Sequence, residues 1–275
     1  MLFWKKPARR LMLVVAASLT TVMPVQMAQA NDLLVAPTRV VLDGQRGTEV
    51  ILNNIGNVEA TYRISLELRR MTPEGALEDV LPENANEKEK STLDIIRYAP
   101  RRVTLPPNQP QAIRIGLQNM ETLPDGEYRA HMLFRAIPPT PAADAADDGS
   151  LKIQLIPIYG ITIPIIVRKG DLEVGAAISN AHLGRDNEGP ALKFDLGRKG
   201  QRSLFGEIRV KKAGVSEPLL VAKGIAIYSE LDQRTVSLAL APEVAAQMHG
   251  DITISYYEAQ EVGGRLITEF RSVLP

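Results

Sequence analysis

The side chains that most often carry out chemistry in proteins are scarce in this chain. It has 275 residues, no cysteine and three histidines, and His131, His182 and His249 each lack a carboxylate at the spacing of metal ligands. It also has no H-E-x-x-H, no G-x-S-x-G and no glycine-rich phosphate loop. We therefore expect no metal, no cofactor and no enzymatic activity, and we assign the histidines structural or solvent-facing roles. Scattered aspartates and glutamates leave an acid and base pair open.

The first thirty residues have the composition of a secretory signal peptide. Four basic residues between positions 5 and 10 precede an apolar run (11–23), and Ala28 and Ala30 give the small-x-small form of a cleavage site. A membrane-spanning helix needs about 20 apolar residues, so this run is too short for one. We expect export to the periplasm with cleavage after Ala30. No later apolar run is both long enough and free of proline to span a membrane.

The charge balance argues against a nucleic-acid partner. The chain has 32 basic and 32 acidic residues, and removing the four basic residues of the leader leaves 28 against 32, a net charge of −4. That balance provides no basic field for a phosphate backbone. The remaining chain, without disulfides, must be stabilised by its hydrophobic core, and its length of about 245 residues suits one large or two ordinary domains.

Short apolar runs with a period of two dominate the rest of the chain. From Tyr62 to Leu68, apolar residues alternate with polar ones, as in a half-buried strand. Turn residues separate such runs at intervals of roughly 8 to 12 residues, which is typical of antiparallel sandwiches. The short polar segment Arg168–Asp171 divides two sets of about seven strands. The sequence therefore predicts an all-β chain of two immunoglobulin-like β-sandwich domains (31–168 and 169–275) that meet at an angle.

Individual segments add detail to this prediction. The composition of Thr72–Thr92 predicts a solvated loop with a short helical turn, and a strand is expected from Leu93 to Tyr98. Pro242–Met248 has a helical pattern. Tyr128 either forms a tyrosine corner, in which its hydroxyl bonds a nearby backbone group, or is an ordinary interface tyrosine. The strands predicted in the second half are Leu172–Ile178, Ala191–Leu196, Leu204–Val210, Leu219–Tyr228, Thr235–Leu240, Ile252–Tyr257 and Arg265–Val273.

The segment from Leu151 to Val167 is longer than one strand and carries two signals. Leu151, Ile153 and Leu155 alternate with polar residues, whereas the second half is apolar almost throughout. Its two prolines exclude a helix, and Pro157 lacks the N–H of a strand ladder, which favours a sheet edge where another chain can be added. The alternative is a buried sandwich strand with prolines at its bends. Taken alone, this segment favours that alternative.

Several segments of the first half also match a known pattern. They are the strand Pro37–Gly44, the strand and turn Thr48–Gly56, the proline turn Leu105–Pro107 with Ile113–Ile115, the strand end Phe134–Pro139 and the alternating strand Leu151–Leu155. Together they resemble the periplasmic pilus-assembly chaperones of the chaperone-usher pathway, the PapD-like family of two-domain immunoglobulin-like proteins. The resemblance covers the first domain almost throughout, and it covers the second only in size and strand count.

This resemblance implies donor-strand complementation. A pilus or fimbrial subunit that lacks its final strand borrows one from the chaperone and is delivered to an outer-membrane usher. Leu151, Ile153 and Leu155 would enter the groove of the subunit, and burial of each would contribute roughly 1.5 to 3 kcal/mol before ordering costs. The alternative is an exported tandem-sandwich adhesion or carbohydrate-binding module. Sugar stacking would then rest on tyrosines, because the one tryptophan, Trp4, lies in the leader.

The resemblance also implies an anchor for the terminal carboxylate of the subunit. The family uses an arginine of the first strand and a lysine of the last, and Arg39 matches the arginine. The lysine has no match, because one register places Gly160 at its position and a shifted register places Pro164 there. Either Arg168 or Lys169 substitutes, or the chain belongs to a divergent branch, or it has lost subunit binding. We favour the divergent branch.

Overall fold

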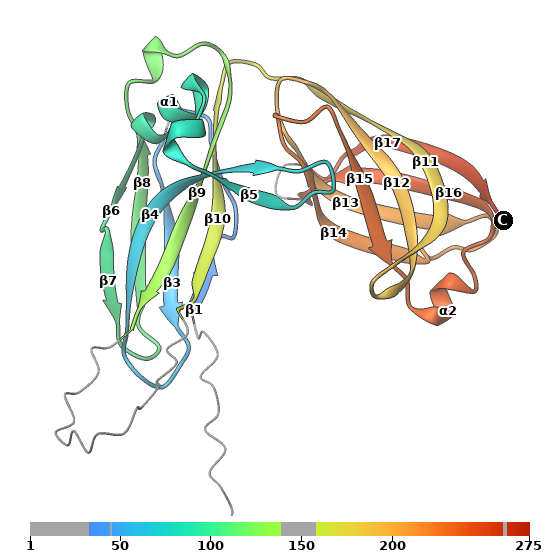
Figure 1. The fold of residues 1–275 in the computed structure, drawn as a ribbon, viewed down its shortest axis with the longest axis horizontal. Coiled ribbons are helices and arrows are strands. Elements are labelled where there is room, and N and C mark those ends of the chain that lie inside the picture. The colour runs from blue at the N-terminus through green and yellow to red at the C-terminus, as the bar shows by residue number, and fades with distance from the viewer. Residues whose placement is uncertain (1–32, 45, 139–157, 261–262) are drawn as a thin grey trace, which may run out of the picture. The chain divides into compact units, whose positions relative to one another are not determined.

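The computed structural model describes residues 33–44, 46–138, 158–260 and 263–275. Within these ranges the chain is nearly all β, with four sheets arranged as two sandwiches (Figure 1). The predicted fold class is thereby confirmed, whereas the division after residue 168 and the angle between the domains stay predictions. The predicted leader lies outside the described residues. None of the helices in the described ranges has the length and apolar character needed to cross a membrane.

The first sandwich consists of two sheets. One has the strand order β1-β3-β8-β6, and the other has the order β2-β10-β9-β4-β5 with β7 also paired to β4. The strands are β1 (Leu33–Ala36), β2 (Val40–Leu42), β3 (Thr48–Asn54), β4 (Ala60–Met71), β5 (Leu77–Val80), β6 (Ile96–Ala99), β7 (Arg102–Leu105), β8 (Pro110–Leu117), β9 (Gly126–Ile137) and β10 (Gly160–Lys169).

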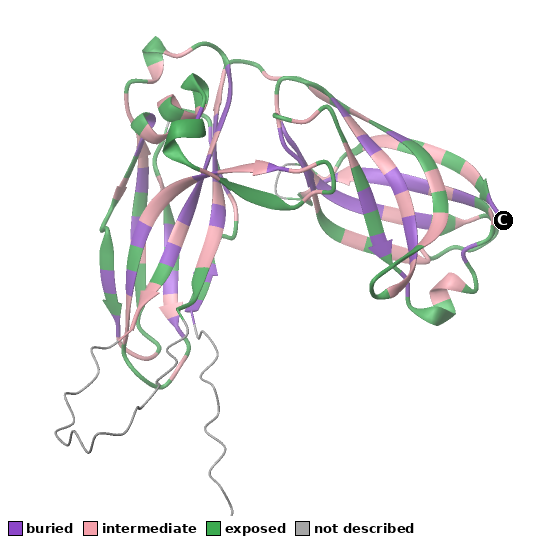
Figure 2. Cartoon of the chain, in the orientation of Figure 1, coloured by how far each residue is buried: buried purple, intermediate pink, exposed green. Residues whose placement is uncertain are grey.

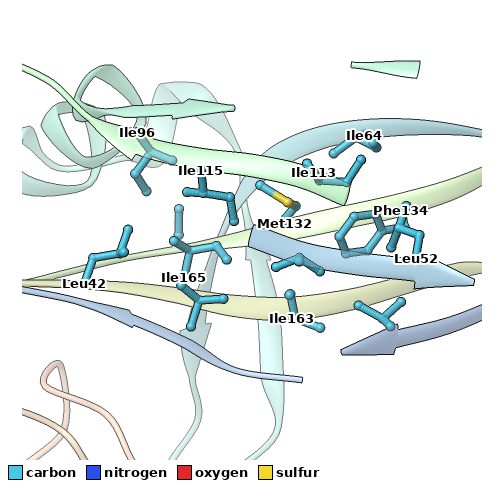
Figure 3. Packing of buried hydrophobic residues seen from close by; sticks show 14 of the residues in the cluster. Leu42, Leu52, Ile64, Ile96, Ile113, Ile115, Met132, Phe134, Ile163 and Ile165 are labelled. Atoms are coloured by element: carbon cyan, nitrogen blue, oxygen red, sulfur yellow. The ribbon is translucent and has the colours of Figure 1, made fainter. Parts of the chain in front are cut away.

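The core of this sandwich is built from apolar side chains of both of its sheets. Met132 and Phe134 of β9 are fully buried, and Ile163 and Ile165 of β10 join the same cluster. Figure 3 shows these side chains beside Ile113 of β8, which comes from the facing sheet. Figure 2 shows buried stretches along the strands of this sandwich. In β3 burial alternates from residue to residue, whereas β9 and β10, in the middle of the other sheet, contain consecutive buried residues. Full burial of each such side chain contributes about 1.5 to 3 kcal/mol.

The first two strands of the chain, β1 and β2, belong to different sheets. β1 pairs antiparallel with β3, whereas β2 pairs parallel with β10 from Ile165 to Val167. The residues of β10 before that point, Gly160 to Pro164, pair with β9 on one side. On their other side no strand pairs with them among the described residues. This half of β10 is here called the open edge of β10.

The second sandwich contains all seven strands predicted for it. The predicted helix is present as the short α2 (Pro242–Ala245). One sheet has the order β11-β12-β15 and the other the order β14-β13-β16-β17. The strands are β11 (Val174–Asp186), β12 (Gly189–Gly200), β13 (Leu204–Lys212), β14 (Leu220–Ile227), β15 (Gln233–Ala239), β16 (Gly250–Glu258) and β17 (Leu266–Leu274).

The segment after β4 is more regular than its composition predicts. Instead of a loop it contains β5, a 3-10 turn η1 (Pro82–Asn84) and the helix α1 (Glu87–Ile95), so the strand expected from Leu93 begins only at Ile96. A capping box starts the helix: the Asn86 side chain accepts from the Glu89 N–H, and the Glu89 carboxylate accepts from the Asn86 N–H, both at 2.8 Å. These two bonds satisfy backbone donors that a helix start otherwise leaves free.

Tyr128 forms the tyrosine corner. Its hydroxyl donates to the carbonyl oxygen of Pro124 at 2.8 Å. The ring itself is buried in the core of the first sandwich. The bond therefore fixes the turn that leads into β9.

A buried carboxylate joins the first sandwich to the second. Glu127, in β9, has a side chain with 0% exposure and accepts from the Arg168 Nε–H at 3.0 Å. It also accepts from the backbone N–H and the hydroxyl of Ser203, each at 3.0 Å. Ser203 directly precedes β13, so this one carboxylate fixes β9, β10 and the start of β13 together.

Replacement of Glu127 should therefore be costly. Glu127→Gln leaves the Arg168 guanidinium without its counter-charge, and breaking a buried ion pair in this way destabilises by about 3 to 5 kcal/mol. The measurement is the free energy of unfolding in urea at pH 7. The matched control is Glu49→Gln, which removes an exposed pair to Arg114 and should have little effect. Equal effects of the two changes would contradict the role assigned to Glu127.

Candidate functional site

A pocket lies where the approach to β2, the turn between β4 and β5, and the strand β14 come together. Its volume of about 390 Å³ falls within the range of small-ligand sites. Its wall is largely apolar, and no aspartate or glutamate of the described chain lines it. We call it the two-arginine pocket, after the cations among its main lining residues: Arg39, Met71, Pro164, Phe205, Tyr228 and Arg234.

Arg39 stands directly before β2 and is half-buried. Its guanidinium carbon lies 4.4 Å from the centre of the Phe205 ring and 5.6 Å from that of Tyr228. Its polar contacts are long, at 3.4 Å to the Tyr228 hydroxyl and 3.5 Å to the Ser203 hydroxyl. Burial lowers the pKa of the Arg39 guanidinium, an effect that Tyr228 and Glu127 oppose. Within the described chain no carboxylate forms an ion pair with it.

Arg234, from β15, reaches the same pocket from the second sandwich. Its Nη1 donates to the Ala226 carbonyl at 2.7 Å and lies 3.8 Å from the sulfur of Met71. Its Nε is buried, and no acceptor for it is present in the described part of the chain. Burial also lowers the pKa of the Arg234 guanidinium. Among the described residues Arg234, like Arg39, has no carboxylate partner.

The turn between β4 and β5 closes over Arg234. Gly75 has φ +91°, and a Cβ built there would lie 2.2 Å from the Arg234 guanidinium carbon. The backbone conformation therefore favours glycine at this position, and a side chain there would displace the Arg234 guanidinium. A backbone bond from the Thr235 N–H to the Pro73 carbonyl, at 2.8 Å, fixes the turn against β15.

A second set of contacts holds Tyr228 in the wall of the pocket. The Arg129 guanidinium carbon lies 3.6 Å from the centre of the Tyr228 ring, and Arg129 forms an ion pair with Glu230. Glu230 also accepts from the Met71 N–H at 2.8 Å, and Arg129 donates to the Arg69 carbonyl at 2.9 Å. Residues of both sandwiches thus fix the apolar wall around the two arginines.

The residues predicted from the resemblance lie in different surroundings. Arg39 and Pro164 both line the two-arginine pocket. Gly160, the other position considered for the missing lysine, pairs with Arg135 on β9. The proposed donor residues Leu151, Ile153 and Leu155 lie outside the described residues.

Both cations named as substitutes for the lysine have partners of their own. Arg168 is paired with the buried Glu127. The Lys169 ammonium donates to the carbonyl oxygens of Met120 and Leu123 at 2.9 and 2.5 Å. Their role as substitutes stays a prediction. Nothing in the sequence pointed to Arg234, because the resemblance in the second half extends only to size and strand count.

Comparison with known proteins adds a likeness of overall structure. No family model matches the chain, and no curated protein matches it. Among solved structures, the chain is similar to several fimbrial chaperones. The Salmonella enterica SafA pilin in complex with the SafB chaperone matches at 14% identity over 90% of this chain and 98% of that one, with a TM-score of 0.46.

Two further structures are similar to the same extent. The E. coli chaperone DraB shares 15% identity over 88% of this chain and 96% of its own, with a TM-score of 0.45. The Pseudomonas aeruginosa CupB2 chaperone shares 12% identity over 88% of this chain and all of its own, with a TM-score of 0.46.

His131 is buried next to the pocket wall. Its ring meets that of Tyr228 edge to face, with centroids 6.4 Å apart, and neither ring nitrogen has a partner in the described chain. Burial lowers the pKa of His131 to about 3, and Arg129, Arg69 and Arg39 contribute in the same direction. The ring is thus held neutral. His182 and His249 are exposed, as predicted, and the described residues contain no group of side chains arranged to hold a metal ion.

Stability should therefore fall as the pH drops below the ordinary histidine pKa of about 6.5. The unfolded chain takes up a proton there, whereas native His131 stays neutral down to about pH 3, so acid favours the unfolded chain. Between pH 7.5 and pH 5 this amounts to about 2 kcal/mol.

Urea unfolding of the parent and of His131→Gln across this pH range measures the effect, because the variant lacks the titrating group. His182→Gln, at an exposed position, is the control and should keep the dependence of the parent. A His131→Gln protein with an unchanged pH dependence would contradict this account.

Proposed function

We propose that the protein is a periplasmic chaperone for pilus or fimbrial subunits. It donates the strand 151–157 to a subunit that lacks its final strand, and it passes that subunit to an outer-membrane usher. The observation that carries this proposal is the position of the open edge of β10, which ends at a cationic pocket. Gly160–Pro164 lack a partner on one side among the described residues, and Pro164 lines the pocket together with Arg39.

The direction of an added strand follows from this arrangement. The open edge runs from Gly160 toward Pro164, and the pocket lies at its carboxyl end. A strand whose terminal carboxylate reaches Arg39 must therefore run parallel to β10, as β2 does just beyond that point. Backbone groups of β10 would supply hydrogen bonds up to Pro164, which has no N–H to donate.

Arg39 suits the recognition of a chain terminus. Its planar guanidinium can bind a carboxylate through two parallel hydrogen bonds, which the point charge of a lysine cannot. An arginine on a strand usually forms a surface ion pair instead, but the described chain offers Arg39 no such partner. The carboxylate of a bound subunit would supply the missing counter-charge.

Arg39→Ala should abolish stable subunit capture while leaving the fold intact. Arg39→Lys should restore capture only in part, because lysine lacks the planar guanidinium that makes two parallel hydrogen bonds. Each variant is co-expressed with a pilin-like subunit, exported and purified, and the amount of co-purified subunit is measured. Arg114→Ala, an exposed arginine of the other sheet, is the matched control. Undiminished capture by Arg39→Ala, or by a subunit extended beyond its natural C-terminus, would refute the anchor.

Changing Ile153 and Leu155 together to Asp should leave the exported protein folded but unable to hold a subunit. The reason is that these side chains are proposed to enter the groove of the partner and not the core of the chaperone. Circular dichroism reports the fold, and co-purification reports the capture. If the double variant unfolds, the two residues belong to the core of the protein, and the strand is not donated.

A further inference from the structure

Arg39 and Arg234 bring two positive charges into one pocket without a counter-charge. Both guanidiniums are partly withdrawn from water, and no acidic residue of the described chain lines the pocket. A buried charge is costly unless it is paired, and each of these two guanidiniums is partly buried. Nearly all buried polar groups in proteins have a hydrogen-bond partner, so the unpartnered Nε of Arg234 also requires an explanation.

We propose that Arg234 is the second cation of the carboxylate site. The terminal carboxylate of a bound polypeptide lies between the guanidiniums of Arg39 and Arg234, and its last side chain packs on the apolar wall formed by Met71, Phe205 and Ile225. This inference rests on the proposed function for the identity of the natural ligand. The chemistry of the site, a carboxylate attached to an apolar or aromatic group, follows from the pocket itself.

The other cations near the pocket are already paired. Arg168 forms an ion pair with Glu127, and Arg129 forms one with Glu230. Lys169 donates to backbone carbonyls away from the pocket. Arg234 therefore fills the place of the lysine that β10 lacks at Pro164, but it does so from the second sandwich.

The origin of the two arginines in different sandwiches affects which ligands the site accepts. Arg39 belongs to the first sandwich and Arg234 to the second, so the anion site is complete only when both sandwiches are in place. An amidated or extended chain end would cover both guanidiniums without neutralising them. Such a ligand is rejected because it leaves buried charges unpaired.

The test uses the intact exported protein labelled with ¹⁵N-arginine and the probe N-acetylphenylalanine. The Nε–H signals of Arg39 and Arg234, assigned from the single variants, should both shift with one dissociation constant. N-acetylphenylalaninamide, which lacks the charge, should leave both unmoved. Arg234→Gln should weaken binding of the acid by about tenfold or more, because a charge-assisted hydrogen bond is lost. Arg271→Gln, an exposed arginine of β17, should bind as the parent does.

Two results would overturn the inference: no saturable shift of the Arg234 signal in the parent, or equal affinity for the acid in Arg234→Gln and the parent. Arg234→Lys, which keeps the charge, covers the case in which the glutamine variant does not fold, and its affinity should be intermediate. The proposed function is tested separately. If Arg39→Ala loses the subunit while Arg234→Gln retains it, the inference about Arg234 fails and the proposed chaperone function is retained. If the probe binds but no subunit is captured, the site stands and the chaperone role fails.

Discussion

The carboxylate of Glu127 is the contact on which the rest of the structure depends. It has no access to water, so Arg168 and Ser203 are partners that solvent cannot replace. Together these contacts hold β9, β10 and the start of β13 against one another. The Ser203 hydroxyl also lies 3.5 Å from Arg39. Ser203, which bonds Glu127 from the second sandwich, therefore lies next to Arg39 and the pocket. The contact with Glu127 thus helps to position the wall of the pocket.

The placement of β1 and β2 in different sheets determines where a partner can bind. Because β1 pairs with β3 and β2 with the last residues of β10, the preceding half of β10 remains open on one side in the described chain. The change of sheet between β1 and β2 places Arg39, which directly precedes β2, at the end of the open edge of β10. An edge that offers backbone hydrogen bonds and a cation that offers charge therefore meet at one point, which is the combination needed to hold the end of an extended chain.

The sequence predicted the architecture because alternation is a local signal. The pattern from Tyr62 to Leu68 is sufficient to indicate a strand, and the same holds for the seven strands of the second half. The length of helix α1 was not predicted, because its composition resembles a loop with a short helical turn, although Asn86 and Glu89 together form a capping signal. Arg234 could not be found from sequence, since only the tertiary fold brings β15 to the turn between β4 and β5.

The most direct test of the central claim is a crystal structure of the exported protein with a synthetic peptide of alternating apolar residues and a free C-terminal carboxylate. The account predicts a peptide strand parallel to β10 along Gly160–Pro164, with its carboxylate oxygens at about 2.7 to 3.1 Å from nitrogen atoms of both Arg39 and Arg234. A peptide bound elsewhere, or one whose carboxylate contacts neither arginine, would contradict it.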